Sequence, residues 1–392
     1  MFARKYRFPA RENRYLKILF LVNGTQDSAA AARAKEFAKC EENDEGTEIW
    51  QCAIAFRPVR KWHGIQRFLG KCLSMKPDLV YVMDTAYAGV LAAFCFRAIS
   101  RCPVIVDTGD AAFALARSTG NYSHLQLWLI RAIEWLAMHT AEGIIVRGSY
   151  HRPVLERSGV KRVEVIPDGV NVLEFQNISV SDIVRCRQRL GLCDNLVIGM
   201  VGTMEWSDRY QMCYGWDIIE ALPRLRDARV KALLVGDGNG RLRLEKRARD
   251  LGVADQVIFV GRIELEQIGL FVAAMDICVS TQSNDQVGWV RTTGKLPLYL
   301  ACGKYVIATD VGEAHRVLRQ IGHLLPYQGV RDEEHPIRLA DHVRRLVENP
   351  EFRQRASGAS SIALQEFDYG MLRLRMKRFC TEVLRSHSKY QR

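Results

Sequence analysis

Two basic residues, Arg291 and Lys295, have the chemistry and the spacing to bind an anion in the segment GWVRTTGKL. A helix is predicted to begin near Pro297, because proline is favoured in the first turn of a helix. Free backbone N–H groups at a helix start attract negative charge, and the two cations would add to that attraction. The segment therefore predicts a diphosphate site at Arg291, Thr293, Gly294 and Lys295, with a solvated basic loop as the alternative.

A glycine and a threonine, Gly202 and Thr203, end the apolar run VIGMVG. The run is predicted to be a buried strand, and a residue without a side chain at its end lets an anion approach the backbone N–H groups. We expect a pyrophosphate at this position. The alternative is a glycine that only turns the chain.

Two carboxylates, Asp107 and Asp110, lie at the end of the predicted strand PVIVD. Residues at the carboxyl end of a parallel strand lie on the ligand side of the sheet. Asp110 is therefore a candidate catalytic group that contacts the sugar or an acceptor hydroxyl, with turn or helix-cap chemistry as the alternative. Asp107, together with Asn23 and Gly24 after the first apolar run, is expected to line the acceptor side.

Apolar runs alternate with segments of helical pattern along the chain, which is typical of β-α-β units. The runs are continuously apolar, so the strands are expected to be buried on both faces of a parallel sheet. The fold class is therefore predicted to be α/β, with two Rossmann-like doubly wound sheets facing a cleft. The predicted strands are KILFLV, EIWQCAIAF, DLVYVM, PVIVD, GIIVRG and VEVIP in the first half, and VIGMVG, KALLVGDG, VIFVGR, ICVST and YVIATD in the second.

The composition excludes several classes of protein. The 392 residues are 48% hydrophobic and 26% charged, which is globular, and the length favours two domains. The longest apolar runs fall short of the ~20 residues that a membrane-spanning helix needs. The 11 cysteines contain no Cys-x-x-Cys pair and suit a reducing compartment. We therefore expect a cytoplasmic protein.

The net charge of +12 indicates an anionic partner. No RNA-binding or zinc-finger pattern accompanies the charge, so nucleic acid is not expected. Residues 57–73, taken as a helix, place Trp62 and Phe68 on one face and Arg60 and Arg67 on the opposite face. This pattern is typical of a helix at the anionic inner face of the cell membrane, and equally of an amphipathic helix packed on a sheet.

The segment VIPDGVNVLEF, residues 165–175, resembles a motif of the retaining GT-B glycosyltransferases of family four, the glycosyl transferases group 1 type. VIGMVGTM, LLVGDGNG, VIFVGRI and KLPLYLACGKYVIATDVGEA resemble further motifs of that family in the same order. The resemblance implies a GT-B fold with an acceptor-binding domain at residues 1–172 and a nucleotide-sugar-binding domain at 173–365. It also implies a C-terminal helix at 366–392 that returns to the first domain.

The resemblance assigns donor-binding roles as well. It matches Gly261, Arg262 and Ile263 to the family loop whose backbone reads the nucleobase. The region of Arg291 and Lys295 corresponds to the one that supplies phosphate contacts in the family.

Two positions depart from the family pattern. Leu298 replaces a glutamate that binds the donor ribose, and Tyr214 replaces a phosphate-binding lysine. Arg209 is the candidate substitute for that lysine. Glu313 is a candidate ribose acceptor, with an outward surface glutamate as the alternative.

These features predict a glycosyltransferase of hexosyltransferase type, which moves a sugar from a UDP- or GDP-sugar to a glycan or lipid-linked glycan in polysaccharide biosynthesis. The resemblance implies retention at the anomeric carbon, without a metal and without a cofactor, since the nucleotide-sugar is a substrate. The alternative is a catalytically idle GT-B-like binding or scaffold protein, because Leu298 and Tyr214 replace donor-binding residues. A dinucleotide-dependent dehydrogenase is disfavoured, because the first loop lacks the Gly-x-Gly-x-x-Gly pattern.

Overall fold

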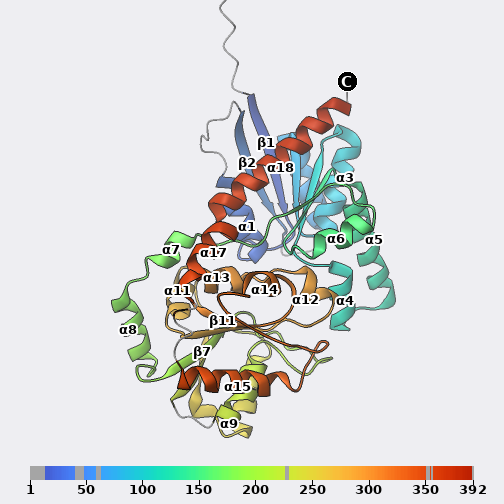
Figure 1. Cartoon of the computed structure of the whole chain (residues 1–392). Coiled ribbons are helices and arrows are strands. Elements are labelled where there is room, and N and C mark those ends of the chain that lie inside the picture. Colours follow the sequence, from blue (N-terminus) through green and yellow to red (C-terminus); the bar gives the residue numbers. More distant parts are fainter. Residues whose placement is uncertain are drawn as a thin grey trace, which may run out of the picture. The chain divides into compact units, whose positions relative to one another are not determined.

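The computed structural model describes residues 14–39, 48–58, 63–225, 229–349, 354 and 356–390 (Figure 1). It contains two six-stranded sheets whose strands pair in parallel and which helices flank. The predicted α/β class with two parallel sheets is thereby confirmed. Every predicted strand is present, and one short strand that the sequence did not indicate, β12 (His323–Leu325), adds an edge to the second sheet.

The first sheet has the strand order β2-β1-β3-β4-β5-β6. Its central strands are continuously apolar, and every residue of β3 is buried, as expected of a sheet covered on both faces. Its strands are β1 (Arg14–Val22), β2 (Glu48–Phe56), β3 (Leu79–Met83), β4 (Val104–Thr108), β5 (Gly143–Val146) and β6 (Val163–Val165). The helices of this stretch are α1 (Ala29–Ala38), α2 (Gly64–Met75), α3 (Tyr87–Ser100), α4 (Ala112–Thr119), α5 (His124–Thr140) and α6 (His151–Arg157).

The second sheet has the strand order β12-β11-β10-β7-β8-β9. Its other strands are β7 (Leu196–Val201), β8 (Val230–Val235), β9 (Val257–Gly261), β10 (Ile277–Ser280) and β11 (Tyr305–Thr309). The helices from residue 172 onward are α7 (Val172–Gln176), α8 (Val180–Arg189), α9 (Trp216–Leu225), α10 (Arg241–Asp250), η3 (Ala254–Gln256), α11 (Leu265–Ala273), α12 (Gln286–Val290), α13 (Lys295–Ala301), α14 (Gly312–Val317), α15 (His335–Glu348), η4 (Ala356–Gly358), α17 (Ala359–Glu366) and α18 (Tyr369–Tyr390).

Contacts divide the chain into two compact units. The first unit comprises Met1–Asp107, Thr140–Gly143 and Lys377–Arg392, and the second comprises Thr108–His139 and Ile144–Met376. All the residues predicted for catalysis and for donor binding belong to the second unit, whereas the acceptor-side residues Asn23, Gly24 and Asp107 belong to the first. The functional domains at 1–172, 173–365 and 366–392 stay a prediction.

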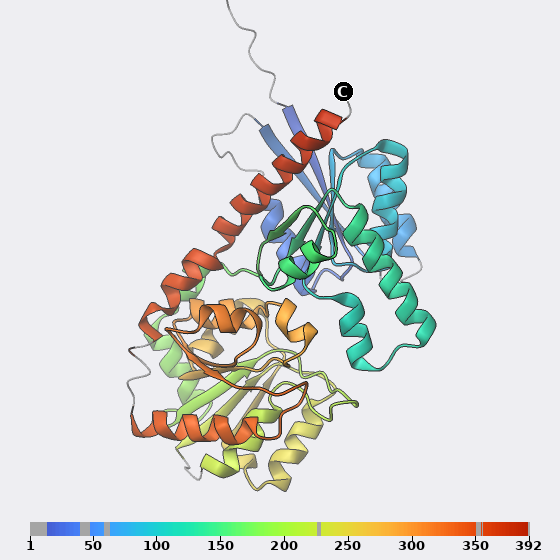
Figure 2. The same cartoon turned by 45° about the vertical axis from the view of Figure 1, so that its right-hand side comes forward.

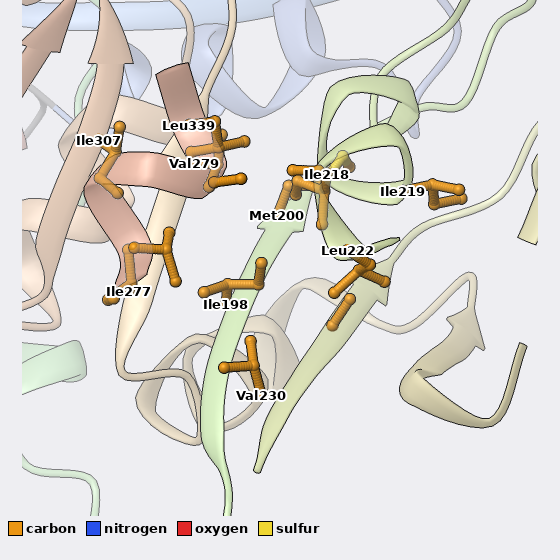
Figure 3. Close-up of a cluster of buried hydrophobic side chains, with 14 of the residues drawn as sticks. Ile198, Met200, Ile218, Ile219, Leu222, Val230, Ile277, Val279, Ile307 and Leu339 are labelled. Atoms are coloured by element: carbon orange, nitrogen blue, oxygen red, sulfur yellow. The ribbon is translucent and has the colours of Figure 1, made fainter. Parts of the chain in front are cut away.

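The core of the second sheet shows why its strand ends are well positioned. Buried aliphatic side chains of four neighbouring strands, among them Ile198, Val230 and Ile277, pack against α9 and α15 on one face (Figure 3). Separate buried side chains cover the other face. A strand that is packed on both sides holds the loop at its carboxyl end in a fixed place, and the candidate site is built from such loops.

The helix expected within residues 57–73 is α2, at Gly64–Met75. Its apolar residues Phe68 and Cys72 are buried, while Arg67 and Lys71 are exposed. Arg60 and Trp62 lie outside the described residues. Among the described residues, the helices are all too short or too polar to span a bilayer.

Candidate functional site

Gly202 and Lys295 lie against each other. Gly202 directly follows β7 and Lys295 is the first residue of α13. A Cβ added to Gly202 would lie 2.7 Å from Cε and 3.1 Å from Nζ of Lys295. The glycine therefore leaves room for the lysine side chain, and a cation stands beside the backbone at the end of a central strand. Two positions that the sequence assigned separately to phosphate binding meet at one point.

Tyr214 holds the ammonium group of Lys295. The Nζ atom lies 3.0 Å from the centroid of the Tyr214 ring, close enough for a strong cation–π attraction. The pKa of Lys295 falls from 10.5 to about 7. Burial is the main cause, and the nearby positive charge of Arg291 adds to it. The lysine is therefore poised to change its charge near neutral pH. Tyr214 occupies the place of the family lysine and retains a cation there by other means.

A small cavity of about 10 Å³ adjoins the side chains of Tyr214 and Lys295, and its lining includes Asp217. Burial raises the pKa of Asp217 from 3.8 to about 7, although a hydrogen bond with Thr281 opposes the shift. The carboxyl group is therefore largely protonated below neutral pH. It adds little negative charge beside Lys295 under those conditions.

Arg291 and Asp110 form an ion pair, with 2.8 Å between Nε of the arginine and Oδ1 of the aspartate. Both side chains are half-buried. Burial by itself would lower the pKa of Arg291, but the carboxylates of Asp110 and Asp168 reverse the effect and raise it. Arg291 is therefore a permanent cation, and the structure brings the predicted sugar-side carboxylate and the predicted phosphate-side arginine into contact.

Two further residues of the same segment complete this surface. Thr293 has a buried Oγ1 without a hydrogen-bond partner among the described residues. Gly294 is exposed, and a Cβ there would meet no other atom within 4 Å. An unpaired buried hydroxyl beside open space is the kind of group that a ligand oxygen can satisfy.

The segment that carries Arg291 is fixed to the loop that follows β5. Thr292 donates a hydrogen bond of 2.6 Å from Oγ1 to the carbonyl oxygen of Arg147. A Cβ on Gly148 would lie 2.3 Å from the carbonyl oxygen of Val290, so only glycine allows this approach. The backbone on either side of Arg291 is therefore held in place, which limits the directions in which its guanidinium can point.

Arg147 is a buried cation that the sequence did not single out. A Cβ on Gly109 would lie 2.6 Å from Nη1 of Arg147, and Nε of Arg147 lies 3.6 Å from Oδ1 of Asp168. The arginine thus fills the space that a side chain at position 109 would need. Its position at the end of the apolar run GIIVRG is the signal that could have found it, since a charge directly after a buried strand calls for a partner.

His151 is a second buried polar group near the ion pair. The first residue of α6, it is 3% exposed, and its Nδ1 has no hydrogen-bond partner among the described residues. Burial lowers the pKa of His151 to about 4, although the charge of Asp110 opposes the shift. The imidazole is therefore neutral at physiological pH.

The predicted acceptor-side residues are engaged inside the first unit. Asp107 is fully buried, where it accepts hydrogen bonds of 2.9 Å from Nε of Arg33 and 2.7 Å from the hydroxyl of Tyr81. The expectation that its carboxylate faces a ligand is therefore wrong for this structure: Asp107 still belongs to β4, and its side chain points into the core. Only Asp110, beyond the strand end, is partly exposed.

Asn23 likewise serves the fold of the first unit. Its amide donates to the carbonyl oxygens of Met83 and Asp84, at 3.0 and 2.8 Å, and accepts from the backbone N–H of Gly89 at 2.8 Å. Gly24 lies so close to Ser28 that an added Cβ would be 2.2 Å from the serine Oγ. These contacts give Asn23 and Gly24 a structural role that does not require an acceptor substrate.

Two donor-side predictions fall on residues that have partners within the protein. Arg209 donates to the carbonyl oxygens of Arg117 and Ser118, at 3.0 and 3.2 Å. Glu313 is buried, and its oxygens accept from the backbone N–H of Ser149 and, at 2.9 Å, from Nε of Arg316. It is thus not an outward surface glutamate, and both of its oxygens are in use.

The remaining predicted donor residues are arranged as follows. Thr203 and Arg262 are exposed, Ile263 is half-buried, and Gly261 accepts a hydrogen bond of 2.9 Å from the N–H of Gly236.

The place of the family glutamate is apolar in this chain. Leu298 is 9% exposed and belongs to the buried cluster on one face of the second sheet, which also contains Leu296 and Leu300. The leucine contributes to that core and offers no acceptor to a hydroxyl group.

The model of the family Glycosyl transferases group 1 matches residues 195–349. The 2-deoxystreptamine glucosyltransferase of Streptomyces kanamyceticus is 25% identical over 233 residues, which are 56% of this chain and 58% of that protein. The alpha-monoglucosyldiacylglycerol synthase of Streptococcus pneumoniae is 23% identical over 248 residues, which are 60% of this chain and 54% of that protein. The chain thus spans little more than half the length of these curated relatives.

Solved structures extend the likeness to almost the whole chain. The crystal structure of HepE from Anabaena, in complex with UDP and glucose, superposes with a TM-score of 0.72 at 21% identity and covers 94% of this chain and all of that chain. A structural likeness at this sequence identity shows the fold alone. The expected GT-B fold is confirmed.

Proposed function

Because residues 195–349 match the glycosyl transferases group 1 that the motifs indicated, we propose that this chain transfers a sugar from a nucleotide-sugar to a glycan or a lipid-linked glycan. One observation carries the proposal. The cations Lys295 and Arg291 lie near the end of β7, where Gly202 leaves room for the lysine side chain. Together they form a cationic surface suited to a diphosphate.

The cationic surface would serve the departure of the leaving group. When the bond between the sugar and the diphosphate breaks, negative charge grows on the phosphate oxygens. Positive groups that are already fixed beside these oxygens stabilise the growing charge. They lower the barrier to bond cleavage, because they do not have to reorganise during the reaction. Arg291 and a protonated Lys295 would supply the positive charge. The backbone N–H of Thr203 would donate a hydrogen bond, whereas that of Gly202 already donates to the carbonyl oxygen of Val235 at 2.9 Å.

The rest of the donor would be bound with few side-chain contacts. The backbone of Gly261, Arg262 and Ile263 would read the base, which leaves UDP and GDP as candidates. Leu298 gives the ribose no acceptor and the oxygens of Glu313 are occupied, so the diphosphate contributes most of the affinity. HepE, which binds UDP and glucose, supports a UDP-sugar as the first donor to test.

We include retention of the anomeric configuration and independence from metal in the proposal, both on the family resemblance. The ion pair with Arg291 supports retention in one respect. Oδ1 of Asp110 is paired with Nε of Arg291 at 2.8 Å, so we do not assign Asp110 as the base of an inverting attack. Asp110 would instead orient a hydroxyl of the transferred sugar or of the acceptor.

The acceptor would lie at the cytoplasmic face of a membrane. The exposed basic residues Arg67 and Lys71 of α2, and His63 directly before it, support a contact between residues 57–73 and anionic lipid. The likeness to a synthase of glucosyldiacylglycerol is in keeping with a lipid acceptor. Phe68 and Cys72 of α2 are buried and Leu73 is exposed, so this contact would be mainly electrostatic and would weaken at high salt.

Titration calorimetry with a panel of UDP- and GDP-sugars tests the proposal. We expect one donor to bind and to be hydrolysed slowly, and NMR of the released or transferred sugar to show the anomer of the donor. Arg291→Ala and Lys295→Ala should each weaken donor binding by more than about tenfold, the usual effect of removing one charge-assisted hydrogen bond. Lys246→Ala, in an exposed pair on α10, is the matched control and should bind normally.

A second candidate function, an idle scaffold of this fold, is favoured by the apolar Leu298 at the ribose position. It predicts that no nucleotide-sugar binds. The same panel distinguishes the two: a donor that binds in the wild type and not in the arginine and lysine variants excludes the scaffold, whereas silence throughout excludes the enzyme.

A further inference from the structure

Helix α5 exposes a continuous apolar stripe. Five apolar residues of this 17-residue helix are exposed, and the four large ones are between 44% and 67% exposed: Leu125, Trp128, Leu129, Ala132 and Trp135. Stepping 100° per residue places all five within about a third of the helix circumference. Single exposed apolar residues need no explanation, but two tryptophans and two leucines in one stripe do.

The opposite face of α5 holds the helix to the protein. Glu134 projects from that face and accepts a hydrogen bond of 3.2 Å from the backbone N–H of Phe113, next to the start of α4. The guanidinium of Arg131 lies 5.5 Å from the ring centroid of Phe113. α4 and α5 therefore form an antiparallel pair (Figure 2). Stepping 100° per residue places Glu134 on the side of α5 away from the stripe.

The charges around the stripe have one sign. Arg117 on α4 and Arg131 on α5 are exposed, and the only acidic residue within 111–140 is Glu134, which is turned toward α4. Tyr122, 45% exposed, lies in the connection between the two helices. Tryptophan and tyrosine favour the boundary between water and lipid, and basic flanks are attracted to anionic headgroups.

We propose that the α5 stripe docks into the surface of an anionic phospholipid bilayer, with Trp128 and Trp135 inserted at the level of the headgroups. An amphipathic helix of this kind lies in the plane of the interface. The surface differs from α2, whose Phe68 and Cys72 are buried in the fold and which exposes one large apolar residue, Leu73, beside its basic residues. The α5 contact is therefore apolar and resists salt, and it does not depend on whether the chain transfers a sugar.

Sedimentation of the whole protein with vesicles of phosphatidylethanolamine and phosphatidylglycerol, at low and high salt, tests the proposal. We expect the wild type to bind at both. The double variant Trp128→Ser, Trp135→Ser should lose roughly a hundredfold or more of the high-salt binding, because two large apolar side chains no longer leave water. Tryptophan fluorescence of the wild type should shift to the blue on binding.

Two controls isolate the stripe. Leu242→Ser removes a single exposed leucine from α10 and should bind vesicles like the wild type. Arg67→Ala, Lys71→Ala on α2 should retain the high-salt binding. Equal unfolding midpoints verify that the variants are folded.

Three results overturn the proposal. They are a wild type that does not sediment with these vesicles, a double tryptophan variant that still binds at high salt, and a dimer in sedimentation equilibrium that only this double variant dissociates. The last result would assign the stripe to a second copy of the chain.

Discussion

The ammonium group of Lys295 lies 3.0 Å from the centroid of the Tyr214 ring, while its Cε lies where a side chain on Gly202 would be. The lysine is thus confined between an aromatic face and a strand end. Burial in this position is the main reason that its pKa falls to about 7. The charge of the candidate site is therefore set by a group that titrates near neutrality.

Nucleotide binding should weaken as the pH rises above 7. The lysine with its lowered pKa is neutral there in the free protein, so binding a diphosphate requires the uptake of a proton, and affinity falls by up to about tenfold per pH unit. Calorimetry with UDP or GDP between pH 7 and 9 measures the slope, since the terminal phosphate is already ionised in that range. Lys295→Arg keeps its charge and should give a flat profile, and an equal slope in both proteins would contradict the assignment.

Gly202→Ala should weaken nucleotide binding more than it lowers stability. The new Cβ displaces the flexible end of Lys295, and the φ of +151° adds backbone strain of about 1 kcal/mol or more. Gly252→Ala is the matched control, because its φ of +68° is also unfavourable but its Cβ would meet no atom within 4 Å. Urea unfolding and calorimetry compare the two. Equal nucleotide affinity in both variants would show that the lysine does not bind the diphosphate.

Asp110→Asn should raise the affinity for a nucleoside diphosphate and lower the rate of sugar transfer. The aspartate competes with the diphosphate for Arg291, from which it lies 2.8 Å away, and its own charge repels the phosphates. We expect roughly tenfold tighter binding of the diphosphate, since one nearby like charge is removed. A catalytic role for Asp110 predicts that turnover falls at the same time. A variant in which affinity and turnover both rise would exclude that role.

Gly109→Ala should destabilise the protein only while Arg147 is present. The added Cβ would lie 2.6 Å from Nη1 of the arginine, an overlap that costs about 1 to 3 kcal/mol of unfolding free energy. In the background of Arg147→Ala the same substitution should cost much less. A double-mutant cycle measured by urea unfolding gives the coupling, and additive effects would show that the arginine does not fill this space.

The two parallel sheets were predictable because their strands are continuously apolar and separated by helical segments. The meeting of Gly202 with Lys295 followed from the same logic, since each stands at the end of an element that faces the carboxyl edge of one sheet. The short strand β12, with only three residues, gave too little pattern to be recognised.

The difference between Asp107 and Asp110 could not be read from the motif alone. Both follow the same apolar run, but Asp107 has Arg33 and Tyr81 as partners, contributed by distant parts of the chain. Such partners are fixed by tertiary packing and leave no local signal. For the same reason, the sequence of α5 does not reveal which of its faces the fold leaves uncovered.

The aromatic ring of Tyr214 has a consequence for the proposed function. A lysine that rests on this ring would give up part of the cation–π attraction to bind a diphosphate, and would regain it when the nucleotide leaves. The tyrosine would thus weaken the binding of the product and shorten its residence on the protein.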